Sequence, residues 1–211
     1  MPDELEIVHN EIDDCLVCCT RGLQLTKSSN LMRGGIGVRV MAVGIAPSGA
    51  AIKSGKAFAG NSFNRLTKWF SSAGFAASEA QLRRAIYLTS LTKCAVSPDT
   101  LANRKLLWRR CQQFLWRQIR ILQPALILLL GMEVARTLFP RDYHPKLAFG
   151  IKYSTDDIFQ QELFPPITIP LTWLLLPHPS GLSRAMNNEE TNRIVIASLK
   201  HELTQIAFAC P

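Results

Sequence analysis

Residues 38–60 read VRVMAVGIAPSGAAIKSGKAFAG, and the first seven positions form a largely apolar run that ends at glycine and proline. Such a run predicts a buried strand. The loop that follows, 44–60, contains four glycines and no carboxylate. It is not a P-loop, because no G-K-[ST] follows at the required spacing, and it lacks the G-x-G-x-x-G of a dinucleotide site. The loop therefore holds a phosphate or a base in some other way, or is a generic glycine-rich turn.

Strands and helices alternate along the rest of the chain. Further strands are predicted at 85–91, 125–130 and 167–177, and helices at 3–19, 63–73, 105–123, 132–139 and 188–207. Strands that are apolar on both faces are typical of a parallel sheet covered by helices on both sides, so we expect an α/β fold. In such a sheet a site lies beyond the carboxyl ends of the strands. The loops 44–60, 90–104 and 177–187 should meet there.

Length and composition indicate one domain, 1–211, with an ordinary core, since the chain has 211 residues of which 47% are apolar. The formal net charge of +8 favours a polyanionic partner such as nucleic acid, although an enzyme with a small anionic substrate would look similar. The acidic start and the short apolar stretches predict a cytoplasmic protein without a membrane span. We expect a monomer.

Six cysteines in a chain with no export signal argue for metal ligation or plain burial rather than for disulfides. Cys15 and Cys18 form a C-x-x-C pair, whereas Cys94 and Cys111 lie far downstream. Burial as small apolar side chains suits the other two cysteines, Cys19 and Cys210.

Several short motifs follow one another in a fixed order. The first loop contributes Gly44, Ala46, Pro47, Gly55, Phe58 and Gly60, and later segments contribute Lys93-Cys94, Asn103-Arg104, Cys111-x-x-Phe114-Leu115 and His178-Pro179-Ser180. In this order they resemble the uracil-DNA glycosylase superfamily, and most closely its iron–sulfur branch, family 4. The resemblance covers residues 15 to about 187.

The resemblance implies a three-layer α/β/α sandwich around a short central parallel four-stranded sheet. It also implies that Cys15, Cys18, Cys94 and Cys111 ligate a [4Fe–4S] cluster, which would tie the N-terminal segment 1–37 to the domain. Structural zinc held by the same four thiolates is the alternative.

The family's site residues map onto this chain by position. His178 would be catalytic, donating a hydrogen bond to the base oxygen as it becomes anionic, and Phe58 would stack on the extruded base. The base-binding set implied by the resemblance is Gly44, Ile45, Ala46, Phe58 and Ser90. Leu182 is the expected wedge that fills the vacated place in the duplex, with Ser180 and Arg184 contacting DNA.

The chain departs from the family pattern at its acids. Ile45, Ala51 and Ile52 stand where the family has carboxylates, and Ser90 replaces the asparagine that reads the uracil edge. Ser48 and Asn61 are therefore candidates for positioning the attacking water. A hydroxyl distinguishes a pyrimidine oxygen from an amino group poorly, which leaves the specificity for uracil open.

The expected function is a monofunctional DNA glycosylase that removes a deaminated or modified pyrimidine, in base-excision repair or in defence against phage DNA with modified bases. Two alternatives stay open at this point. One is a catalytically inactive protein that binds damaged or single-stranded DNA, and the other is an enzyme acting on free nucleosides.

Overall fold

The computed structural model describes residues 3–18, 26–27, 35–95, 104–155, 171–180 and 188–208, without the side chains of 26–27 and 104–106. Its centre is a five-stranded sheet of order β3-β2-β5-β7-β6. The strands are β2 (Val40–Gly44), β3 (Ile86–Ser90), β5 (Leu126–Leu130), β6 (Lys152–Tyr153) and β7 (Thr172–Leu176). The four longer strands are parallel, as predicted, and the two-residue β6 adds an antiparallel edge.

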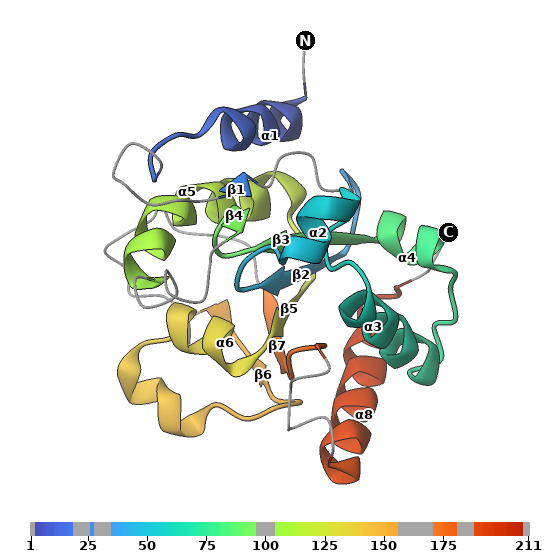
Figure 1. Cartoon of the computed structure of the whole chain (residues 1–211). Coiled ribbons are helices and arrows are strands. Elements are labelled where there is room, and N and C mark those ends of the chain that lie inside the picture. The colour runs from blue at the N-terminus through green and yellow to red at the C-terminus, as the bar shows by residue number, and fades with distance from the viewer. Residues whose placement is uncertain are drawn as a thin grey trace.

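Helices cover both faces of this sheet, which confirms the three-layer α/β/α sandwich (Figure 1). One face carries α2 (Gly49–Ser54), α3 (Asn61–Ser72), α4 (Glu79–Ala85) and α8 (Glu189–Gln205). The other carries α5 (Arg104–Leu122) and α6 (Met132–Leu138), with α1 (Glu4–Asp14) packed on α5 and a 3-10 turn, η3 (Arg141–Lys146), after α6. Within the described segments, no helix combines the length and apolar character needed to cross a bilayer.

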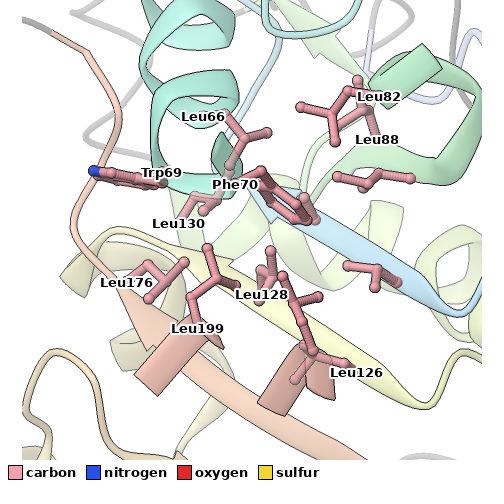
Figure 2. Packing of buried hydrophobic residues seen from close by; sticks show 14 of the residues in the cluster. Leu66, Trp69, Phe70, Leu82, Leu88, Leu126, Leu128, Leu130, Leu176 and Leu199 are labelled. Carbon is pink, nitrogen blue, oxygen red and sulfur yellow. The ribbon is translucent and has the colours of Figure 1, made fainter. Parts of the chain in front are cut away.

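The strands are apolar on both faces because each face is covered. Leu126, Leu128 and Leu130 point towards α3 and α8, whereas Ile127 and Leu129 point towards α5 and α6. Figure 2 shows the first of these faces, where side chains of α3 and α8 meet the leucines of β5. A fully buried leucine contributes about 1.5–3 kcal/mol to folding, so these two cores specify the sheet and its register.

The structure differs from the prediction in its short helices. The N-terminal helix ends at Asp14 rather than at residue 19, so the C-x-x-C pair lies beyond it, with Cys15 in extended backbone and Cys18 in a turn. Helix α2 forms inside the glycine-rich loop, and α4 precedes β3 behind a capping box made by Ser78 and Gln81. A separate two-stranded sheet pairs β1 (Thr26–Lys27) with β4 (Cys94–Ala95). Residues 167–170 of the last predicted strand lie outside the described residues.

Candidate active site

A cavity opens where β2, β3 and β7 end. Strand β2 lies between β3 and β5, so the chain changes direction across the sheet there, which is where ligands bind in open α/β sheets. The cavity brings together the loop after β2, the turn after β3 and the segment after β7. Five of the predicted site residues line it: Ala46, Ser48, Phe58, Ser90 and His178.

The ring of Phe58 lies directly over Gly44 at the end of β2. A Cβ placed on Gly44 would lie 2.8 Å from Cζ of the ring, so only glycine permits this approach. Phe58 itself has a φ of 53°, a conformation that non-glycine residues seldom adopt. The surrounding loop must therefore hold the ring at the cavity against a local backbone cost.

Arg83 supplies that support from α4. Its side chain is buried, and Nη1 donates to the carbonyl oxygen of Ala57 at 2.6 Å, immediately before the strained residue. The guanidinium also lies 3.7 Å from the ring centroid of Phe63 and donates through Nε to Glu79 at 2.8 Å. The hydrogen bond from Arg83 holds the pKa of the exposed Glu79 carboxyl below its usual value. Arg83 thus fixes the loop that carries Phe58.

His178 follows β7 and lines the same cavity as that loop. The backbone N–H of Ser180 donates to Nδ1 of His178 at 3.1 Å. Because an N–H can only donate, Nδ1 must be unprotonated, and the hydrogen of the neutral ring is on Nε2. Burial lowers the pKa of His178, which favours this neutral form. Gly131 lets the ring sit close to the end of β5, since a Cβ there would lie 3.2 Å from Cβ of His178.

Ser90 ends β3 and has one hydroxyl in place of an amide. Its Oγ donates to the carbonyl oxygen of Thr92 at 2.6 Å, within the turn that follows the strand. Thr92 in turn donates through Oγ1 to the carbonyl of Ile45 at 3.2 Å, which ties this turn to the loop after β2. The only hydroxyl proton of Ser90 is committed, and the side chain can offer a ligand only lone pairs.

Lys93 lines the cavity although sequence patterns did not single it out for this place. Its side chain is 5% exposed, and Nζ donates to Thr89 Oγ1 at 2.8 Å, to the Ser90 carbonyl at 2.7 Å and to Gln118 Oε1 at 2.9 Å. These three neutral acceptors match the three hydrogens of an ammonium group. No carboxylate lines the cavity among the described residues, so the ammonium gives this pocket a positive character.

The remaining predicted residues fall into three groups. Gly44 and Ile45 do not line the cavity. Gly44 lies under the ring of Phe58, and Ile45 packs against the core. Asn61 is exposed at the start of α3, and its neighbour Ser62 lines the cavity instead. Leu182 and Arg184 lie outside the described residues, while Ser180 is described and accepts a hydrogen bond from Arg65.

Sequence reasoning missed the lining residues Ile12, Leu88 and Thr89 besides Ser62 and Lys93, and it gave Pro47 only as a motif residue and Ala57 only as a small residue where the family has proline. Ile12 comes from α1 and reaches the cavity through a packing contact that no local pattern signals. Leu88 and Thr89 belong to a predicted strand whose position in the sheet could have identified them.

The four candidate cysteine ligands are free thiols on three segments of the fold. Burial raises the pKa of the Cys111 thiol. This thiol hydrogen-bonds to the backbone of Lys93, next to Cys94, and lies close enough to Cys18 and Cys15 to interact electrostatically with their thiols. Among the described residues, no three His, Cys, Asp or Glu side chains are already arranged to hold a metal ion. Four thiols from neighbouring segments are nevertheless the donor set of an iron–sulfur cluster or of structural zinc.

Comparison with known families assigns this arrangement to one of them. The model of the uracil DNA glycosylase superfamily matches residues 32–200. No curated protein matches the chain closely enough to name a relative. The matched range includes the whole central sheet and every lining residue of the cavity except Ile12. The chain therefore belongs to the uracil DNA glycosylase superfamily.

Proposed function

We propose that this protein is a monofunctional DNA glycosylase that flips a deaminated or modified pyrimidine out of DNA, hydrolyses its N-glycosidic bond and leaves an abasic site. The observation that carries the proposal is the shared cavity of His178, with its hydrogen on Nε2, and Phe58, held over Gly44. A buried base cannot be reached inside a stacked duplex, so it must enter such a pocket.

His178 would stabilise the departing base. As the glycosidic bond breaks, its electron pair leaves with the base, and negative charge develops on the base oxygens while the sugar becomes cationic. A neutral imidazole that points Nε2–H at such an oxygen acts as an oxyanion donor. The water oxygen then bonds to the sugar carbon, and solvent takes up its proton and protonates the base.

Two hydroxyls are the best candidates for holding that water, since the cavity has no carboxylate among its described lining residues. Ser48 caps α2 by accepting the Ala51 N–H at 3.1 Å, which leaves its own proton to donate. Ser62 lines the cavity from the first turn of α3. The role expected for Asn61 stays a prediction, and its exposed position one residue away makes it a natural control.

Ser90, and Ala57 where the family pattern has proline, favour a base other than unmodified uracil. An amide both donates and accepts, and it reads the O4 and N3–H of uracil together, whereas the Ser90 hydroxyl only accepts here. Both residues are also smaller than the asparagine and proline of the family pattern, which leaves space for a substituent on the pyrimidine ring. A repair role and a role against phage DNA with modified bases both fit this reading.

We further propose that Cys15, Cys18, Cys94 and Cys111 hold a [4Fe–4S] cluster, as in the family 4 branch, with zinc as the alternative. The proximity of Cys111 to Cys18 and Cys15 supports this ligand set. When bound, the cluster would supply a covalent link between the segment after α1 and the elements around β4 and α5. The residues of the cavity would do the chemistry without it.

DNA is the partner that this activity requires. The net charge of +8 supports binding to phosphates, and Lys53 and Lys56 are exposed beside the loop that carries Phe58. Leu182 and Arg184 remain candidates for the wedge and a phosphate contact.

The test is a panel of oligonucleotides containing uracil, hypoxanthine, thymine mismatches or modified cytosines, scored for alkali-labile abasic sites. At least one base should be released, and the release should fall about 100-fold or more in His178→Ala, the usual effect of losing an oxyanion donor. The missing carboxylates favour one rival, a protein that only binds DNA. That rival predicts salt-sensitive binding without release of any base and near indifference to His178→Ala.

A further inference from the structure

We infer that Arg65 is a positioning residue that holds the His178 imidazole in its hydrogen-donating form, an inference that rests on the proposed glycosylase function. Arg65 lies on α3 and is half-buried. Its Nη1 donates to the carbonyl oxygen of Ser180 at 3.2 Å, joining positions 115 residues apart in the sequence. None of the motifs in the sequence includes this arginine.

The same serine controls the tautomer of the histidine. The N–H of Ser180 is the group that donates to His178 Nδ1, while its carbonyl accepts from Arg65. Arg65 therefore fixes the carbonyl group of Ser180, and the N–H of the same residue determines which nitrogen of His178 carries the hydrogen. If Ser180 moved, Nδ1 could take up the hydrogen and Nε2 would lose its ability to donate.

The local sequence makes this outside support necessary. His178 lies between Pro177 and Pro179, and proline has no backbone N–H to anchor the segment. The N–H of Ser180 is the first one after His178, and it is already used on the imidazole. The hydrogen bond from Arg65 anchors the segment to α3. This helix is held in place because it packs against the sheet through Phe63, Leu66, Trp69 and Phe70.

The matched set of variants separates this role from general charge effects. Arg65→Leu removes the tie, Arg65→Lys keeps a cationic donor, and Lys68→Leu removes an exposed charge from the same helix. We expect Arg65→Leu to lower kcat by about tenfold with little change in KM, since a hydrogen bond from a charged donor is lost. Arg65→Lys should recover much of this loss, and Lys68→Leu should leave kcat unchanged.

The ¹⁵N chemical shifts of the histidine rings test the inference without any substrate. The chain has four histidines, and His178→Gln identifies the signal of interest. At neutral pH the intact protein should show His178 protonated on Nε2. Arg65→Leu should shift the signal towards a mixture of both tautomers. Its thermal unfolding midpoint should stay close to that of Lys68→Leu, which shows that the variant is folded.

An unchanged tautomer in a folded Arg65→Leu protein overturns the inference, whatever the enzyme does with DNA. An increase in KM with kcat and tautomer unchanged would also overturn it, by making Arg65 a phosphate contact. If the tautomer shifts but no oligonucleotide in the panel loses a base, the glycosylase assignment fails and the link from Arg65 to His178 stands.

Discussion

The imidazole of His178 and the hydroxyl of Ser90 each have their hydrogen-bonding direction fixed by a neighbouring backbone group. The Ser180 N–H leaves His178 a donor at Nε2, and the Thr92 carbonyl leaves Ser90 an acceptor. A base in the cavity would therefore find a donor on His178 and lone pairs on Ser90. These assignments follow from which atoms can donate, and they lead to predictions about pH and about the base.

The first prediction concerns pH. Burial lowers the pKa of His178 below 6.5, so the neutral ring should persist through neutral pH, and kcat/KM should fall only as the pH drops through that lowered pKa. A protonated Nδ1 can no longer accept the Ser180 N–H, which would disturb the segment after β7. Single-turnover rates measured across the acid range should show this limb. An acid limb of the same shape in His178→Gln would contradict its assignment to this residue.

The same pKa has a consequence for stability. The folded value lies below the unfolded one, so the unfolded chain takes up the proton first as the pH falls. The free energy of unfolding is therefore unaffected by His178 above about pH 6.5, and it decreases as the pH falls below that value towards the lowered pKa of the folded protein. Urea unfolding of the intact chain and of His178→Gln should therefore diverge in the pH dependence of the free energy of unfolding on the acid side.

The second prediction concerns the base. Ser90→Asn restores an amide that both donates and accepts, and we expect the rate of uracil release relative to the preferred base to rise about tenfold, the effect of one neutral hydrogen bond. Steady-state competition between two labelled oligonucleotides measures this ratio. Ser90→Ala is the control and should not raise it. An equal rise in both variants would show that loss of the Ser90 hydroxyl, rather than the added amide, changes the preference.

At the scale of elements, α4 stabilises the loop 44–60, which contains α2 and Phe58. The buried Arg83 links this helix to the Ala57 carbonyl, and the neighbouring residue carries the positive φ. Helix α4 was not predicted from the sequence, yet its S-E-A-Q start is the signature of a capping box. Recognising that signature would have placed Arg83 on a helix, although not its contact with the loop.

A third prediction tests this support. Arg83→Leu leaves the buried Ala57 carbonyl without its donor, and we expect a loss of about 1–3 kcal/mol in the free energy of unfolding together with a lower kcat. Chemical denaturation and single-turnover kinetics measure the two effects. The adjacent Arg84 is exposed, so Arg84→Leu should change neither. Equal effects of both variants would mean that charge on α4, not the bond to Ala57, is what matters.

At the scale of the molecule, most of the architecture could be predicted from the sequence. The strands are apolar on both faces and the long helix α5 has a regular apolar face, so their burial is visible in the residue pattern. The convergence of three loops at one sheet edge follows from parallel strands. The contacts of Ile12 and Lys93 could not be predicted, because they depend on how α1 and Gln118 pack against segments distant in the sequence.

A fourth prediction concerns the cysteines. Protein purified without air should contain iron and acid-labile sulfide in equal amounts, and Cys111→Ser should lose both and unfold more readily, because a cluster stabilises the segments that it joins. Elemental analysis and thermal unfolding measure the two properties. Cys210→Ser, outside the proposed ligand set, should retain the metal. Zinc without sulfide would replace the cluster with the alternative, and the absence of both metals would contradict the ligand set.

The most direct test of the account is the release of a base by the intact protein and by His178→Ala under conditions where both bind the oligonucleotide. The account predicts free base and an alkali-labile site for at least one deaminated or modified pyrimidine, with release about 100-fold slower or worse in the variant. Binding to every oligonucleotide of the panel without release from any of them, or equal release by both proteins, would contradict it.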